Sequence, residues 1–227
     1  MNIIYLLFHG LSPYSGISKK ILYQVKAFET CGHRVSLCTY SIADNGHRVR
    51  MINDEIIDDY GTGKPAAAKR RVSYQCIYRY AVTHQVELIY VRSFHNANPF
   101  TIRLFSKLRK AGIKIAMEIP TYPYDSEYAG FPLVTRLGIQ VDKVFRKTLA
   151  KHVNAIVTFS DYHRIFGQRT IQISNGVDFD SIPLKKTVSK NTSVIHLLGV
   201  AEVHYWHVSL SSLASLAQWT ITPRLSS

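Results

Sequence analysis

Acidic and aromatic side chains gather in one short stretch of the chain, residues 118–127. Its sequence is EIPTYPYDSE, in which two prolines restrict the backbone and so hold the neighbouring side chains in place. Carboxylates and tyrosines arranged in this way can bind sugar hydroxyls or take a proton from one. We therefore predict Glu118 as a catalytic base and Tyr122, Asp125 and Glu127 as substrate-binding residues. The alternative is a structural loop whose acids cap the next helix or pair with basic helices.

Two other stretches could bind an anion. Gly10 and Gly16 bracket a loop that runs into a predicted helix, where backbone N–H groups and the helix dipole favour negative charge. Gly16 and Lys19 are therefore predicted to bind substrate, although a plain connecting loop would have the same pattern. Elsewhere, Arg92, His95 and Asn96 follow an apolar run and could contact a phosphate or a sugar. A lone histidine is more often an ordinary polar residue than a catalyst.

Strand-like apolar runs alternate with helical patterns and could position these stretches. Strands are expected at 2–8, 34–40, 87–91, 113–119, 155–159 and 170–174, and helices at 17–30, 64–85, 99–111 and 133–151. Residues 44–63 are expected to form a polar excursion. Repeated strand–helix alternation predicts an α/β fold, a Rossmann-like doubly wound parallel sheet. Ligands bind such sheets outside the carboxyl ends of the strands, where all three stretches would lie.

The helices are expected to cover the sheet with their apolar faces. Along 17–30 the inward residues would be Ile17, Ile21, Leu22, Val25 and Phe28, and Val72 would point inward from 64–85. The helix at 133–151 would turn its apolar side to the sheet, using Leu137, Val141, Val144, Phe145 and Leu149.

The chain of 227 residues has a formal net charge of +13, and the excess lies on two segments. Residues 64–110 hold ten basic side chains and one acid, and residues 133–151 hold five basic side chains and one acid. Such segments attract phosphate or anionic lipid. We predict that Lys143, Arg146, Lys147 and Lys151 face an anionic membrane, the alternative being a solvated basic face. No recognised nucleic-acid motif occurs, so no nucleic acid is expected as a partner.

Cysteine usage and hydropathy indicate a cytoplasmic protein. The three cysteines have no CxxC spacing, so neither a disulfide framework nor a metal site is expected. No apolar run is long enough to cross a bilayer, and the first residues do not resemble a signal peptide. A peripheral position at the inner face of the cell membrane would be compatible with the basic segments.

A break in composition divides the chain. Residues 1–184 are expected to form the α/β domain and the polar, basic residues 185–192 a linker. Residues 193–207 look like the first strand and loop of a second domain. The tail, 208–227, is rich in serine and poor in charge, and does not fit a completed fold.

Several short motifs resemble the GT-B glycosyltransferases of the group 1, or GT4, type. The most specific is ISNGVD at 173–178. Others are GHRV at 32–35, AIVTFS at 155–160, and LLGVA and WH at 197–201 and 206–207. Their order and spacing carry the resemblance over residues 1–207. It implies transfer of a sugar from a nucleotide-sugar to a glycan or lipid-linked acceptor in polysaccharide biosynthesis, with no cofactor. The N-terminal domain would be the acceptor domain, with Asn175 and Gly176 near the interdomain region.

The end of the chain departs from that family. Its donor-binding domain uses glutamate, yet the last acid here is Glu202. The expectation is an acceptor half that is incomplete and inactive alone. The alternative function is a non-catalytic α/β module that binds an anionic lipid or glycan.

Overall fold

The computed structural model describes residues 1–93, 95–124 and 133–176, all of which belong to one unit, Met1–Asp178. Two predicted site residues, Asp125 and Glu127, lie outside the described residues. So do the predicted linker at 185–192, the strand and loop at 193–207 and the tail at 208–227.

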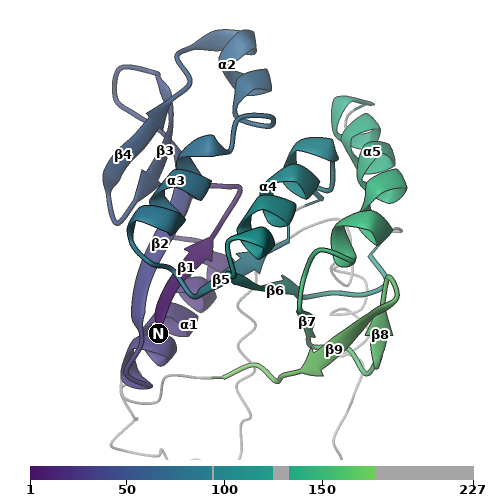
Figure 1. The fold of residues 1–227 in the computed structure, drawn as a ribbon. Coiled ribbons are helices and arrows are strands. Elements are labelled where there is room, and N and C mark those ends of the chain that lie inside the picture. Colours follow the sequence, from purple (N-terminus) through teal and green to yellow (C-terminus); the bar gives the residue numbers. More distant parts are fainter. Residues whose placement is uncertain (94, 125–132, 177–227) are drawn as a thin grey trace, which may run out of the picture. The chain divides into compact units, whose positions relative to one another are not determined.

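Strands and helices alternate over most of the described chain (Figure 1). The strands are β1 (Asn2–Leu6), β2 (Arg34–Ile42), β3 (Arg48–Ile52), β4 (Glu55–Asp59), β5 (Leu88–Arg92), β6 (Lys114–Ile119), β7 (Ala155–Thr158), β8 (Arg164–Ile165) and β9 (Gln168–Gln172). The helices are α1 (Gly16–Thr30), α2 (Gly63–Lys69), α3 (Gln75–Thr83), α4 (Pro99–Lys110) and α5 (Leu133–Ala150).

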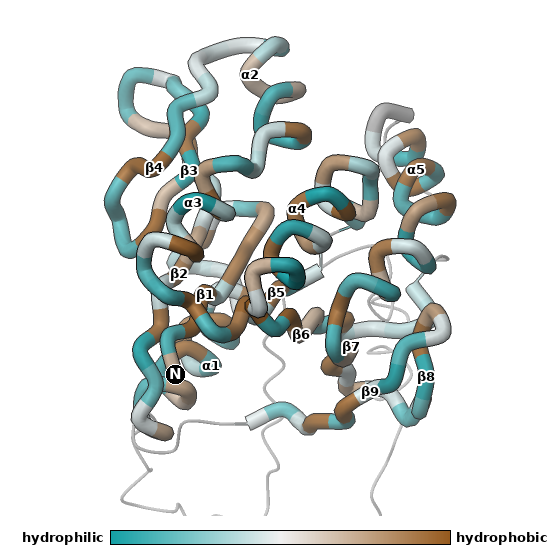
Figure 2. The backbone as a smooth tube through the Cα atoms, in the orientation of Figure 1, coloured by the Kyte–Doolittle hydropathy of each residue, from teal (hydrophilic) through white to brown (hydrophobic). Residues whose placement is uncertain are grey.

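The strands form one sheet in the order β4-β3-β2-β1-β5-β6-β7-β9-β8. Neighbours from β2 to β9 pair in parallel, whereas β3, β4 and β8 pair antiparallel at the two edges. The predicted α/β doubly wound sheet is confirmed. Strand β1 shows why both faces must be covered: Ile4 and Leu6 join the core beneath α3, α4 and α5, while Ile3, Tyr5 and Leu7 pack with α1. The most hydrophobic segments run through these central strands (Figure 2).

Residues 44–63, predicted as a polar excursion from the sheet, instead contribute two strands to it. Residues 48–59 form the β3–β4 hairpin, which extends the sheet beyond β2. Asn53 and Asp54 connect the two strands with φ of 47° and 69°. Positive φ at both central residues is the signature of the tight turn that matches strand twist, and asparagine and aspartate tolerate it. This Asn-Asp pair was the available sequence signal.

The single long helix predicted at 64–85 is also wrong, because the chain turns between α2 and α3. Two carbonyls of this turn accept hydrogen bonds from side chains instead of from the next helical turn. Tyr74 Oη donates to the carbonyl of Arg71 at 2.7 Å, and Tyr60 Oη donates to that of Ser73 at 3.4 Å. Val72, predicted to point inward, is 43% exposed in this turn.

Helix α5 does not turn its whole apolar stripe to the sheet. Leu149 is buried and Phe145 half-buried, as predicted, but Leu137, Val141 and Val144 are 59%, 45% and 70% exposed. In α1, likewise, Ile21 is buried whereas Ile17 and Leu22 are exposed. Helical spacing marks which apolar residues share a face, but the angle at which the helix packs decides how much of that face is covered.

Candidate functional site

A cavity of about 580 Å³ opens at the carboxyl ends of β1, β5 and β6. Strand β1 lies between β2 and β5, so the chain runs to one side of β1 first and then to the other. Ligands of open α/β sheets bind at such a switch point, because the loops of the two neighbouring strands diverge there. The cavity is lined by residues at the ends of these strands and in the segments that follow them: His9, Gly10, Ser12, Ser15, Gly16, Ile17, Ser18, Lys20, Arg92, Ser93, His95, Ile119, Pro120, Thr121 and Tyr124.

The start of α1 forms one wall of the cavity. Ser15, Gly16, Ile17 and Ser18 line it, and the side chain of Ser15 makes no capping hydrogen bond to the helix. A Cβ placed on Gly16 would meet no atom within 4 Å, so open space adjoins this residue. The backbone N–H groups and the dipole of the first turn favour an anion at this end. The predicted anion-binding role of Gly16 therefore has a suitable geometry.

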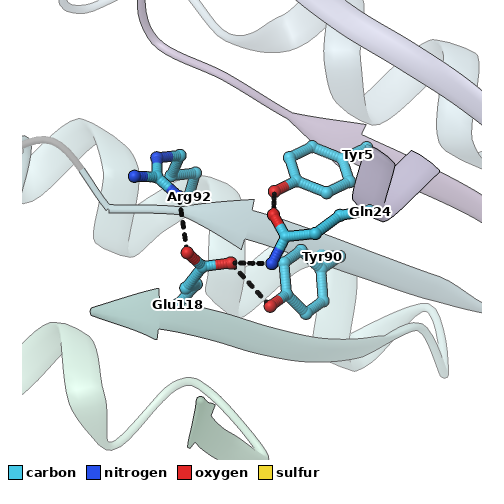
Figure 3. Close-up of polar contacts among 5 residues, drawn as sticks. All are labelled: Tyr5, Gln24, Tyr90, Arg92 and Glu118. Carbon is cyan, nitrogen blue, oxygen red and sulfur yellow. Dashed lines mark hydrogen bonds and ion pairs between the residues drawn. The ribbon is translucent and has the colours of Figure 1, made fainter. Parts of the chain in front are cut away.

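Glu118 is the centre of a network of polar side chains, of which Arg92 also lines the cavity (Figure 3). Glu118, on β6, is 0% exposed and accepts hydrogen bonds from three side chains. Arg92 donates to one oxygen at 2.5 Å, while Tyr90 and Gln24 donate to the other at 2.7 and 2.9 Å. Tyr5 donates in turn to Gln24 Oε1. Each carboxylate oxygen therefore has at least one partner supplied by the fold.

This network gives Glu118 a different position from the one expected of a catalytic base. Its carboxylate does not line the cavity, and a base must come within hydrogen-bond reach of the proton it takes. Arg92 is 6% exposed and does line the cavity, so the role that the geometry supports for Glu118 is to hold Arg92 in place. Burial and the charge of Glu118 raise the pKa of Tyr90 and of Tyr5, which keeps both hydroxyls protonated as donors.

The cavity lining is rich in basic groups. Arg92, Lys20, His9 and His95 contribute, and the described lining contains no aspartate or glutamate. Lys20 Nζ lies 3.5 Å from the centre of the Phe159 ring, and burial lowers the pKa of this lysine although the charge of Glu118 opposes the shift. Such a lining favours a ligand that carries negative charge and hydroxyl groups.

Of the other predicted residues, His95 lines the cavity, whereas Lys19 and Tyr122 do not. His95 lies in the cavity wall, where its ring centre is 4.7 Å from that of Tyr124. Lys19 is exposed outside the described lining. Tyr122 packs edge-on against the ring of Phe166 instead, at 5.5 Å between ring centres.

The remaining predicted positions also lie outside the cavity. The carbonyl of Asn96 accepts from the side chains of Asn98 and Thr101 at the start of α4, which is a structural role. Asn175 and Gly176 are exposed and do not contribute to the described lining.

Two features of the site were missed in the sequence. His9 and Ser93 line the cavity because each follows a buried strand, and their place after an apolar run was the signal. Asp142 is 3% exposed on α5, where it accepts from the backbone N–H of Ala97 at 2.9 Å and from Tyr124 Oη at 3.4 Å. Asp142 thus connects the segments that follow β5 and β6 to α5. No local sequence pattern reveals such a long-range contact.

A pH dependence follows from His9. Burial lowers its pKa below the ordinary value of 6.5, a hydrogen bond to the Gly10 carbonyl opposes this, and the charge of Arg92 adds to it. As the pH falls, His9 therefore takes up a proton in the unfolded chain before it does so in the folded chain. His9 therefore costs the folded state no stability above pH 6.5. The free energy of unfolding falls as the pH drops through 6.5 toward the pKa of His9 in the folded chain.

We expect His9→Gln to reduce this loss, as measured by urea unfolding at pH 7 and pH 5. The same change at His33, outside the cavity lining, controls for the loss of an imidazole. An NMR titration giving His9 a pKa at or above 6.5 would contradict the prediction.

The described residues contain no cluster of metal ligands and no membrane-spanning helix. Within residues 1–93, 95–124 and 133–176, no group of three or more histidine, cysteine or acidic side chains could hold a metal ion. No helix among the same residues has the length and hydropathy needed to cross a bilayer. The chain matches no family profile and no curated protein sequence.

Proposed function

We propose that the described α/β unit is the acceptor-binding domain of a glycosyltransferase that uses a nucleotide-sugar as donor. The observation that carries the proposal is the cavity at the switch point, which both the open first turn of α1 and Arg92 line. An acceptor with hydroxyl and phosphate groups, such as a glycan or a lipid-linked sugar, suits that lining. The resemblance of ISNGVD at 173–178 and of the other motifs to group 1 glycosyltransferases supplies the reaction class.

The cavity can be tested with a substitution that fills it. Gly16→Leu adds a side chain where the wall is open, so it should displace a ligand while leaving the fold intact. Ala27→Leu, at an exposed position of the same helix, is the matched control. Saturation-transfer NMR with N-acetylglucosamine 1-phosphate and with short glycans should show binding to the wild type and to Ala27→Leu. In Gly16→Leu, loss of a charge-assisted hydrogen bond alone would weaken binding at least about tenfold.

Two results would contradict this proposal. One is undiminished binding of the sugar phosphate to Gly16→Leu, which would place the sugar elsewhere. The other is binding of nucleoside monophosphates with no binding of any sugar compound, which would indicate a different nucleotide-dependent activity.

The exposed face of α5 favours a second function, docking to an anionic membrane. Leu137, Val141 and Val144 follow one another at helical spacing and are exposed. Lys147 on the same helix and Lys151, directly after its end, are exposed as well. Apolar residues beside lysines are the pattern of helices that lie on anionic bilayers.

Two of the predicted membrane-facing residues do not share that exposed face. Arg146 is half-buried, with its guanidinium 4.7 Å from the centre of the Phe166 ring. Lys143 is half-buried as well. The docking surface therefore consists of the three exposed apolar residues with Lys147 and Lys151.

Vesicle flotation measures this docking. Wild-type protein should float with vesicles of phosphatidylcholine and phosphatidylglycerol at low salt, and less at high salt, because screening weakens the lysine contribution. Val141→Glu with Val144→Glu should reduce the bound fraction severalfold. Ile56→Glu, at an exposed apolar residue on β4, is the control. Equal loss in the control, or binding that does not depend on salt, would contradict docking through α5.

A further inference from the structure

Basic side chains surround Tyr40 at the carboxyl end of β2, next to the cavity. Arg48 donates to Tyr40 Oη at 2.7 Å, and the guanidinium of Arg70 stacks 4.3 Å from the centre of the Tyr40 ring. Arg50 lies directly opposite Tyr40 on β3, is 1% exposed, and donates to the Leu7 carbonyl at 2.7 Å. Arg71, next to Arg70, is exposed, and one of its guanidinium nitrogens would lie 4.0 Å from a Cβ on Gly138 of α5. We call Arg48, Arg50, Arg70 and Arg71 the arginine cluster.

The arginine cluster contains more positive charge than its described surroundings neutralise. None of its members takes part in an ion pair within the described residues. The Nε donors of Arg50 and Arg70 are buried and have no hydrogen-bond acceptor in that same part of the chain. Burial lowers the pKa of Arg70, and the charges of its three neighbours lower it further, with Tyr40 opposing them. Buried donors and unpaired charges are both unfavourable unless an acceptor with negative charge satisfies them.

The fold holds these arginines together from separate parts of the sequence. Arg48 and Arg50 alternate along β3 and so share one side of the hairpin. Ala66 of α2 packs with Tyr40 and Tyr60, which places the end of α2, and with it Arg70, over Tyr40. Because β3 carries two of the four guanidinium groups and Arg70 directly follows α2, the spacing of these three is set before any ligand arrives.

The arginine cluster is distinct from the cavity but adjoins it. The backbone N–H of Tyr40 donates to the His9 carbonyl at 3.4 Å, and a Cβ on Gly10 would lie only 2.9 Å from the Tyr40 carbonyl. None of the four arginines lines the cavity. A ligand in one site would therefore not occupy the other.

We propose that the arginine cluster is a binding site for a phosphate or diphosphate group. Guanidinium groups bind phosphate oxygens through paired N–H donors, and several of them near one another favour a group with more than one negative charge. The aromatic ring of Tyr40 supports Arg70 through cation–π contact and so fixes the direction of its donors. This inference stands on the geometry of the cluster and does not depend on the glycosyltransferase proposal.

Isothermal titration of the full chain with inorganic diphosphate, at constant ionic strength, tests the site. We expect binding to the wild type and at least about tenfold weaker binding to Arg70→Gln and to Arg71→Gln, the loss of one charge-assisted contact. Arg34→Gln is the matched control, since it removes the same charge from an exposed residue at the amino end of β2. It should bind as tightly as the wild type. Because Arg71 is exposed, Arg71→Gln keeps the test valid if Arg70→Gln does not fold.

A second arm identifies the source of the phosphate. Flotation with phosphatidylcholine vesicles, with and without phosphatidic acid, is compared between wild type and Arg71→Gln. Vesicle binding that requires both phosphatidic acid and Arg71 assigns the site to a lipid headgroup. Diphosphate binding without such flotation assigns it to a soluble ligand.

Three results would overturn the proposal. The first is the absence of both diphosphate and vesicle binding. The second is an equal loss in Arg34→Gln, which would show that only net charge matters. The third is binding that Gly16→Leu abolishes and Arg70→Gln and Arg71→Gln leave unchanged, which would place the anion at the start of α1.

Discussion

Glu118→Gln is expected to lower the free energy of unfolding by about 3–5 kcal/mol, because it leaves Arg92 as a buried charge without a counterion. Glu118 is fully buried and Arg92 is 6% exposed, so water reaches the site of the lost carboxylate poorly. The change also weakens the acceptor that Tyr90 and Gln24 share. Urea unfolding at pH 7 measures the effect.

A double-mutant cycle separates the ion pair from the rest of the network. In the Arg92→Met, Glu118→Gln double variant no buried charge is left unpaired, so its loss of stability should be smaller than the sum of the single losses. Additive losses would contradict a coupled pair. A Glu118→Gln protein that keeps wild-type stability would contradict the role of Glu118 in holding Arg92.

Phe105→Ala is expected to cost about 3–5 kcal/mol of stability, whereas Phe100→Ala should change it by less than about 0.5 kcal/mol. Both phenylalanines lie on α4, but Phe105 is 0% exposed in the core beneath α3, α4 and α5 and Phe100 is 47% exposed. The first change leaves a cavity against the sheet, and the second removes a ring that remains largely in water.

Urea unfolding measures the free energy of unfolding of both variants, which differ only in the position changed on α4. Equal destabilisation by both changes would contradict the packing of α4 described here. A large effect of Phe100→Ala alone would mean that its side of the helix is covered by another part of the chain.

Local patterns in the sequence were sufficient for the parallel body of the sheet. Apolar runs such as 2–8 and 113–119 must be buried on both faces, and helices must alternate with them to cover the sheet. The glycines that end α1 and α4, Gly32 and Gly112, adopt φ of 79° and 83°, as helix ends of this kind require. From these elements alone, the carboxyl edge could be predicted as the place of the ligand site.

Other features depended on contacts between distant residues. In the turn that separates α2 from α3, the Ser73 carbonyl accepts a hydrogen bond from Tyr60 Oη, 13 residues earlier in the chain. The exposure of Val144 depends on the angle at which α5 packs. Neither is encoded in spacing along a single segment.

The sequence by itself determined the alternation of strands and helices. It also determined which loops follow the central strands, and that the segments 64–110 and 133–151 carry the excess positive charge. Only the tertiary structure decided that Glu118 neutralises Arg92 at the cavity and that arginines 22 residues apart meet around Tyr40. Periodicity is a property of neighbouring residues, so it fixes which face of an element is apolar. Ion pairs and anion sites depend on distances in space between elements, and these distances exist only once the sheet has formed.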